Sequence, residues 1–251
     1  MPTVEELSAP FENYLLPVLA ASAGVCPICH TAKEDGFPFC YQCDQARRIL
    51  GDTTDALGFV ALAAKDNQFA RDLWVYKSPE IGSIAQRTQL GLAAVLWRWL
   101  KLHESCVARE AGTEEFEVVT SIPSIKRPSG HPLETVVSSL VQPTADRYQV
   151  LLSPNPHSAR GHILVQDRFT VTMSLSGIKS ILIVDDTFTM GSRVQGASFA
   201  LKNAGVETVG AVCLGRHLAP PSSEPYRQLH LDYLKSAKQL GWSWDTCALC
   251  R

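Results

Sequence analysis

The chain has 251 residues, 45% of them hydrophobic, and a formal net charge of −2 at neutral pH. This apolar content is enough for a sizeable buried core, and the near-neutral charge argues against a generally basic nucleic-acid-binding surface. No apolar stretch reaches transmembrane length, and acidic residues precede the most apolar early segment, which argues against a signal peptide. We therefore expect a cytoplasmic protein without membrane insertion, in which the eight cysteines are metal ligands or free thiols.

The first predicted element is a small metal-binding ribbon. Two C-x-x-C pairs, Cys26/Cys29 and Cys40/Cys43, are separated by a short loop that allows the two knuckles to face each other. Four thiolates would complete a tetrahedral Zn²⁺ site without an open position for water, which predicts a structural role. The alternatives are a redox-active pair and incidental thiols.

A helix over residues 44–50 and a strand over residues 57–63 are expected after the ribbon. A long amphipathic helix is then predicted beyond Pro79, because apolar residues recur at helical spacing. They form one stripe: Leu92, Val95, Leu96, Trp99 and Leu102.

From residue 116 onward, predicted strands alternate with predicted helices. The strands are expected over residues 116–122, 148–152, 180–184 and 208–214, and the helices over residues 133–141 and 193–204. Gly205 is the expected C-terminal cap of the second helix. This alternation predicts an α/β fold with a parallel sheet, in which ligands bind beyond the carboxyl ends of the strands.

The loop between the first strand of this region and its helix contains two adjacent cations, Lys126 and Arg127. If the strand is parallel to its neighbours, this loop lies at the ligand-binding edge of the sheet, where it can neutralise a pyrophosphate. The alternative is a solvated charge pair on a surface turn.

The strand over residues 180–184 runs directly into Asp185 and Asp186, and a Thr/Gly/Ser turn then leads into a helix. A helix N-terminus offers unpaired N–H groups and favours a phosphate, whereas two carboxylates suit hydroxyl groups or a divalent metal. The combination suits a sugar 5-phosphate; the alternative is an ordinary buried strand with a polar exit. The turn runs through Thr187, Phe188, Thr189, Met190, Gly191 and Ser192.

A third C-x-x-C pair, Cys247/Cys250, lies near the end of the sequence. Its nearest candidate partners for a second zinc site are Cys213 and His217, although Cys213 stands in a predicted strand, where cysteine is usually a small core residue. A free thiol pair and a docked tail remain alternatives. Cys106 has no partner motif and is interpreted as structural.

Taken in order, the four-cysteine ribbon, Tyr76-Lys77, the strand ending at Ile122-Pro123, residues 167–169 and the Asp-Asp loop form a recognisable series. The series resembles the ComF family of competence-associated proteins, which are similar to amidophosphoribosyltransferases. The resemblance covers roughly residues 14–216 and is strongest at the cysteine pairs and at the Asp-Asp loop.

The resemblance implies a type I phosphoribosyltransferase fold with a small N-terminal zinc ribbon of four cysteines. It divides the chain into an N-terminal helix and ribbon (1–50), a phosphoribosyltransferase-like α/β domain (51–216) and a C-terminal extension (217–251). The implied ligand is 5-phosphoribosyl-1-pyrophosphate (PRPP) with Mg²⁺, or a ribose 5-phosphate nucleotide. By the resemblance, Asp185 and Asp186 would hold the ribose hydroxyls, and the turn from Thr187 to Ser192 would surround the 5-phosphate.

Two functions follow from the resemblance. The first is transfer of the phosphoribosyl group to a nitrogen acceptor with release of pyrophosphate. The second is a non-catalytic PRPP or nucleotide sensor, or a DNA-uptake protein with single-stranded DNA or a competence-type helicase as partner. Met190 and Arg193 stand where the family usually carries hydroxyl residues, which favours binding over turnover.

Overall fold

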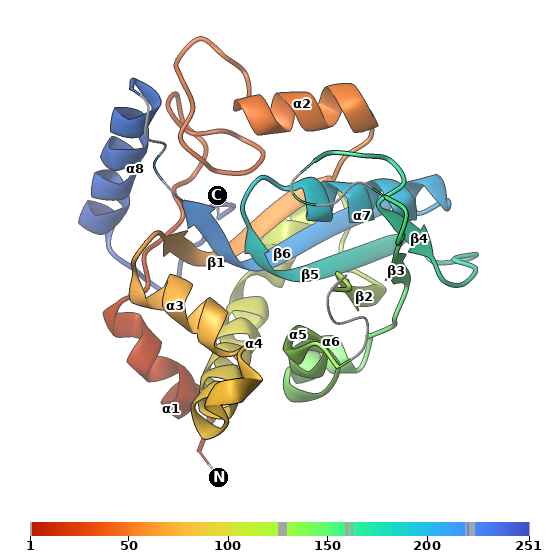
Figure 1. Cartoon of the computed structure of the whole chain (residues 1–251), viewed down its shortest axis with the longest axis horizontal. Helices are drawn as coiled ribbons and strands as arrows, with labels where there is room; N and C mark the ends of the chain where they lie inside the picture. The colour runs from red at the N-terminus through yellow and green to blue at the C-terminus, as the bar shows by residue number, and fades with distance from the viewer. Residues whose placement is uncertain are drawn as a thin grey trace.

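Four strands form the central sheet of the protein, in the order β1-β6-β5-β2 (Figure 1). The computed structural model describes residues 2–124, 130–158, 161, 163–218, 220 and 224–250. Every neighbouring pair of strands in this sheet is parallel, which confirms the predicted α/β class. The strands are β1 (Ala56–Ala64), β2 (Val118–Ser121), β5 (Ser180–Phe188) and β6 (Thr208–Leu218).

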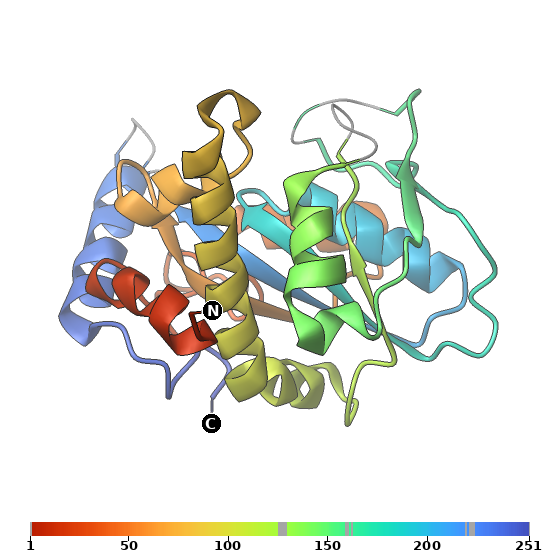
Figure 2. The same cartoon turned by 90° about the horizontal axis from the view of Figure 1, so that it is seen from below.

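Helices cover both faces of this sheet (Figure 1). On one face, α4 crosses β1 and β6 between α1 and the segment of α5 and α6, as Figure 2 shows from below. On the other face, α7 packs on β5 and β6, and α2 packs on α7. The α-helices are α1 (Val4–Ser8), α2 (Tyr41–Leu50), α3 (Gln68–Val75), α4 (Ser83–Ala111), α5 (Pro132–Thr135), α6 (Gln142–Ala145), α7 (Ser192–Asn203) and α8 (Tyr226–Leu240). Shorter turns of other helix types are η1 (Ala9–Asn13), η2 (Pro79–Ile81) and the π-helical η3 (Val136–Leu140). No helix within the described ranges is both long enough and apolar enough to span a membrane.

The core has two parts, one on each face of the sheet, and β5 contributes to both. Ile181 and Ile183 belong to the part that contains α7 and the cysteine ribbon. Leu182 and Val184 belong to the part that contains α4. Successive side chains of a strand point to opposite faces, so a strand buried on both faces has no polar alternation. This is why the sequence before Asp185 is uninterruptedly apolar.

The long helix α4 follows the predicted apolar stripe through Leu92, Leu96 and Trp99, each of which is almost fully buried. Leu102, however, is 45% exposed, and His103 is buried in its place at 2% exposure. Three helical turns span 10.8 residues, so the position 11 residues after Leu92 continues its stripe better than the position 10 residues after it. The predicted stripe was therefore wrong at its last position.

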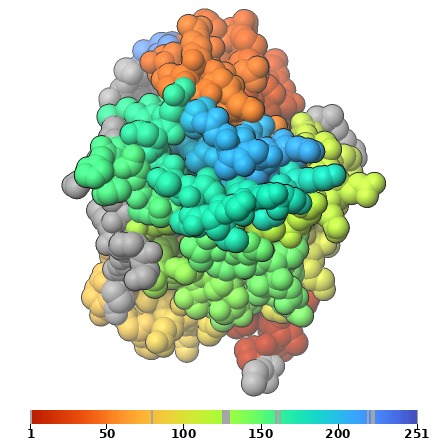
Figure 3. Space-filling model, turned by 90° about the vertical axis from the view of Figure 1, so that its right-hand side faces the viewer, coloured from red at the N-terminus to blue at the C-terminus, as the bar shows by residue number. Residues whose placement is uncertain are grey.

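The strand expected over residues 148–152 does not join the central sheet as a ladder. Tyr148 makes only a single parallel bridge with Val119. The amide of Leu151 then donates to the Thr120 hydroxyl (3.4 Å), and the carbonyl of Leu151 accepts from the Thr172 amide (2.9 Å), which turns the chain away from β2. A separate antiparallel pair follows, formed by β3 (Leu152–Pro154) and β4 (Phe169–Val171). Figure 3 faces the side of the molecule where this pair lies, in green to turquoise, below α2 in orange.

The helix expected over residues 133–141 is a short α-helix, α5, that continues into η3. The widened turn leaves backbone carbonyls to be satisfied elsewhere. The Thr144 hydroxyl does so by donating to the carbonyls of Val137 (2.6 Å) and Val141 (2.9 Å).

Candidate functional site

Asp185 and Asp186 lie in the last half of β5, where both side chains are buried. Because adjacent strand residues point to opposite faces, Asp185 projects toward α7 and Asp186 toward α3 and α4. The sheet register supports this, since Asp185 lies opposite Cys213 of β6 on the α7 face. The two acids therefore meet different partners although they are adjacent in sequence.

Asp186 is held by two neighbours from the segment after α3. The Lys77 ammonium lies 2.7 Å from its Oδ2, and the Tyr76 hydroxyl donates to the same oxygen at 2.8 Å. Burial alone would raise the pKa of Asp186, but Lys77 and Arg193 lower it below its ordinary value. Asp186 is therefore an ionised carboxylate at neutral pH.

Asp185 is less well compensated than Asp186. Its only ionic neighbour in the described part of the chain is Arg193, whose Nη2 lies 3.6 Å from Oδ1, beyond hydrogen-bond distance. Both carboxylate oxygens are buried and have no hydrogen-bond partner among the described residues. Burial raises the pKa of Asp185 to about 6, against a lowering effect of Arg193. A buried acceptor pair of this kind is costly unless a ligand donates to it.

The turn after β5 is fixed by Gly191, which has φ +79° and precedes the first residue of α7. A Cβ atom at this position would lie 2.4 Å from the Phe188 ring, so only glycine fits both the backbone angle and the space. As the N-cap of α7, Gly191 makes no side-chain cap hydrogen bond. The first-turn N–H groups of α7 therefore have no capping side chain, and the positive end of the helix dipole faces the turn.

A hollow of about 400 Å³ opens at this end of β5. Its lining contains the two acids, the turn, the first turn of α7 and three basic side chains. The basic residues are Lys77, Arg193 and His217. The hollow thus combines carboxylate acceptors with cations and a helix N-terminus, which suits a ligand with both hydroxyls and phosphate.

The two acids predicted for the ribose, Asp185 and Asp186, line this hollow. So do the turn residues predicted around the phosphate, namely Thr187, Phe188, Thr189, Met190, Gly191 and Ser192. Lys126 and Arg127, predicted for the pyrophosphate, lie outside the described residues. The end of β2, from which their loop departs, is next to β5 in the sheet.

No protein-family model, curated protein or solved structure matches this chain. The resemblance to the ComF family therefore rests on the motifs alone, and the function has to be argued from the chemistry of the hollow.

Arg216 of β6 contacts both the turn of the hollow and the cysteine ribbon, and the sequence did not single it out. It is 4% exposed, and its guanidinium donates to the carbonyls of Phe188 (3.1 Å), Thr189 (3.2 Å) and Cys29 (2.7 Å). Its Nη2 also lies 3.6 Å from the Cys29 sulfur. A single buried cation thus connects the turn of the hollow to the cysteine ribbon. An arginine inside an otherwise apolar strand was the available signal, because such a charge needs buried partners.

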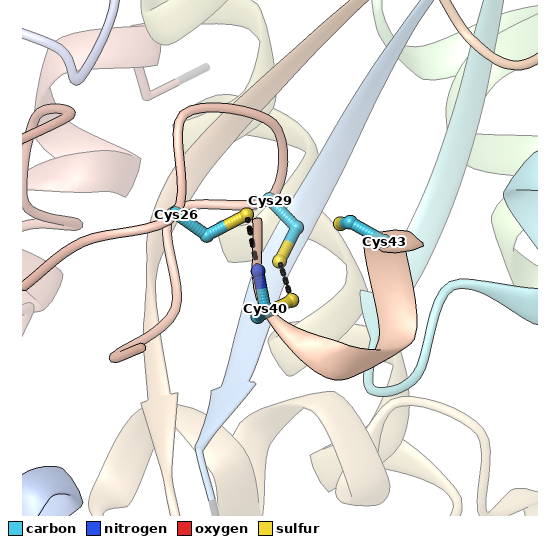
Figure 4. Close-up of side chains that lie close together, drawn as sticks. All are labelled: Cys26, Cys29, Cys40 and Cys43. Carbon is cyan, nitrogen blue, oxygen red and sulfur yellow. Dashed lines mark hydrogen bonds between the residues drawn. The ribbon is translucent and has the colours of Figure 1, made fainter. Parts of the chain in front are cut away.

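The first two cysteine pairs come together as predicted (Figure 4). Cys26 and Cys29 lie in a loop, whereas Cys40 precedes α2 and Cys43 lies in its first turn. The four sulfurs are buried and lie within 4.8 Å of one another. The sulfurs of Cys29 and Cys40 are 3.5 Å apart, close to the value of about 3.8 Å expected for two thiolates on one tetrahedral Zn²⁺. This cluster can hold zinc.

The predicted ligand set of the second zinc site is not brought together. Cys213 is fully buried in β6 on the α7 face, and His217 lines the hollow. Cys247 and Cys250 instead pack against the core on the α4 face. The sheet itself therefore separates Cys213 from the C-terminal pair, and His217 belongs to the lining of the hollow and not to the C-terminal cluster. The C-terminal cysteines instead lie beside Cys106 and His103 of α4, so Cys106, which has no partner motif near it in the sequence, has neighbours from a distant segment.

Proposed function

We propose that this chain binds PRPP or a ribose 5-phosphate nucleotide in the hollow at the end of β5. The observation that carries the proposal is Asp185, whose two buried carboxylate oxygens face a hollow and lack hydrogen-bond donors in the described part of the chain. The two neighbouring hydroxyls of a ribose can each donate a hydrogen bond to one of the two oxygens of a single carboxylate. The 5-phosphate would occupy the turn ending at Gly191, against the first N–H groups of α7.

The charges around the hollow support the same orientation of the ligand. Lys77 and Arg193 lie beside the acids and would contact the anionic parts of a bound ligand. Lys126 and Arg127 are the residues we propose for the pyrophosphate. Mg²⁺, bound together with PRPP, would supply further positive charge to the departing group.

As an enzyme, the chain would transfer the phosphoribosyl group from PRPP to a nitrogen acceptor and release pyrophosphate. A nitrogen lone pair forms the new bond to the anomeric carbon, and the bond to the pyrophosphate oxygen breaks with its electron pair. Asp185 and Asp186 would orient the ribose, and no residue has to form a covalent bond.

A non-catalytic sensor of PRPP or of a nucleotide is the second candidate, and the pairing of the acids favours it. Asp186 is already paired with Lys77 and accepts a hydrogen bond from Tyr76, and Asp185 has Arg193 as an ionic neighbour. A ligand must compete with these contacts, and Met190 and Arg193 offer no hydroxyl to the phosphate. Both features lower transition-state stabilisation more than they lower binding.

Titration calorimetry with PRPP and Mg²⁺ tests the binding proposal. The native chain is expected to bind, and Asp185→Asn is expected to lose at least tenfold in affinity. Asp146→Asn is the matched control, because Asp146 is exposed and the substitution removes the same charge. Absence of binding by the native chain, or equal affinity for all three proteins, would contradict the proposal.

Pyrophosphate release separates the enzyme from the sensor. The protein with PRPP and Mg²⁺ is assayed against a panel of nucleobases and small amines. Release that depends on one acceptor and is lost in Asp185→Asn supports transfer. Binding without release for every acceptor supports the sensor.

We also propose a structural zinc ion for the ribbon cluster. Four buried thiolates leave no position for water or substrate, which is the pattern of structural sites. Metal analysis of Cys40→Ser/Cys43→Ser should show one equivalent of zinc fewer than the native chain. An unchanged zinc content in a folded variant would refute the assignment.

A further inference from the structure

The second cluster of metal-ligating side chains lies on the opposite face of the sheet from the ribbon. His103 and Cys106 are three residues apart on α4, so they point to the same side of the helix. Cys247 and Cys250 approach them from the segment after α8. We propose that these four residues bind one zinc ion, which fastens the C-terminal segment to α4.

The distances between the ligand atoms match a tetrahedral site. Bond lengths of about 2.3 Å for Zn–S and about 2.05 Å for Zn–N place two sulfurs about 3.8 Å apart and a sulfur and a nitrogen about 3.6 Å apart. The Cys250 sulfur lies 3.4 Å from that of Cys247 and 3.8 Å from that of Cys106. The His103 Nδ1 atom lies 3.5 Å from the Cys250 sulfur and 3.9 Å from the Cys106 sulfur. All four atoms lie within 4.8 Å of one another.

The imidazole of His103 is oriented as a metal ligand requires. Its Nε2 atom lies 2.7 Å from the carbonyl oxygen of Trp244, which can only accept a hydrogen bond. The proton is therefore on Nε2, and the lone pair of Nδ1 is on the side of the ring that contacts the sulfurs of Cys106 and Cys250. A backbone carbonyl that fixes the second ring nitrogen is a common outer contact of zinc-bound histidines.

The cysteine knuckle of the C-terminal segment has a supporting contact of its own. The amide of Cys247 donates to the sulfur of Cys250 at 3.1 Å, which fixes the position of that sulfur within the C-x-x-C turn. A disulfide between these two cysteines would use two of the four groups. The disulfide would leave Nδ1 of His103 and the thiol of Cys106 without a group that both of them can bind. A metal ion uses all four groups at once.

The ion would join parts of the chain that are far apart in sequence. After α8, residues 241–250 form no helix or strand, and the C-terminus lies beside α4 in Figure 2. The guanidinium of Arg98 lies over the ring of Trp244 in this segment, 4.2 Å from the ring centroid. Arg98 also forms an ion pair with Glu12 at 2.8 Å. A cross-link between α4 and this segment closes a loop of well over one hundred residues, and the binding free energy of the metal becomes folding free energy.

Native mass spectrometry tests the proposal by counting metal in the reduced protein. Cys247→Ser/Cys250→Ser should carry one zinc ion fewer per chain than the native protein. Cys213→Ala, which removes a buried cysteine outside both clusters, should keep the native count. An equal zinc content in the native chain and in the double variant would overturn the proposal. A native chain isolated without reductant that is lighter by two hydrogen atoms and carries a Cys247–Cys250 disulfide would also overturn it.

A measurement on the native chain keeps the proposal testable if the double variant does not fold. Cadmium-113 substitution gives one resonance for each site, and its position distinguishes four sulfur ligands from three sulfurs and one nitrogen. A resonance of the three-sulfur type is expected, with coupling to the His103 imidazole. Its absence would refute the site. The result is independent of PRPP binding, because none of the four ligands lines the hollow.

Discussion

Replacement of Asp185 by asparagine should make the folded protein more stable at pH 8, although it removes the residue that carries the proposed ligand binding. The reason is the raised pKa of Asp185, about 6 in the folded protein against an ordinary value of 3.8. The folded state holds the proton more tightly than the unfolded chain. The stability that Asp185 contributes is therefore complete below about pH 4 and is lost as the pH rises through about 6.

The size of the effect follows from the same two pKa values. A shift of about two units corresponds to roughly 3 kcal/mol of cost for the ionised form at pH 8, and to about half of that at pH 5. Asparagine is neutral at every pH, but its buried amide lacks partners and costs about 1–2 kcal/mol. The variant should therefore equal the native chain at pH 5 and exceed its free energy of unfolding by about 1–2 kcal/mol at pH 8.

Urea denaturation followed by tryptophan fluorescence between pH 5 and pH 8 measures this difference. The range stops at pH 5 because protonation of metal-binding thiolates would add a second pH dependence below it. Asp146→Asn again serves as the control, since it makes the same substitution at an exposed position that does not line the hollow. A difference between Asp185→Asn and the native chain that stays constant with pH, or that favours the native chain more at pH 8, would refute the reasoning.

Three further substitutions probe the contacts around the hollow. Arg216→Lys should lower the free energy of unfolding by about 2–4 kcal/mol and speed the release of zinc to a chelator. The reason is that one ammonium group cannot donate to the carbonyls of both the ribbon and the turn. Unchanged kinetics of zinc release would argue against a link between the ribbon and the turn through Arg216. Gly191→Ala should lower the free energy of unfolding more than Gly205→Ala, because both glycines have positive φ but only Gly191 lies against a neighbouring ring. Of these two variants, only Gly191→Ala should weaken PRPP binding. Equal losses of stability in chemical denaturation would contradict this. Tyr76→Phe should cost about 2 kcal/mol in the same assay, against about 1 kcal/mol for the control Tyr148→Phe, because Tyr76 donates to a buried carboxylate and Tyr148 pairs with a neutral serine hydroxyl; a larger loss for the control would be inconsistent with a charged Asp186.

The sequence was most informative where local pattern and tertiary placement coincide. The apolar run before Asp185 predicts a strand buried on both faces, and such a strand must be central to a sheet. The two close cysteine pairs also meet as expected, because a short loop leaves them few alternatives. In both cases the relevant neighbours are near in sequence.

The sequence was least informative where the partner is distant. A C-x-x-C pair indicates that two metal ligands are available, but it does not indicate on which face of the sheet the other two ligands lie. Cys213 was the nearer candidate in sequence, yet it lies on the α7 face, whereas His103 and Cys106 lie with the C-terminal pair on the other. The buried position of His103 was readable from an 11-residue helical period, which an apolar stripe drawn through Leu102 overlooked.

Arg216 shows why the ribbon and the hollow form one structural unit. A guanidinium inside the core is costly unless its donors are paired and its charge is balanced. Its donors are paired by carbonyls of the turn and of Cys29. Four thiolates on a divalent ion leave a net double negative charge within contact distance of the same guanidinium. A metal-loaded ribbon would therefore hold Arg216 in its charged, buried position, and Arg216 in turn holds the carbonyls of Phe188 and Thr189. Through Arg216, the conformation of the turn after β5 therefore depends on the four-cysteine cluster, although that cluster does not line the hollow.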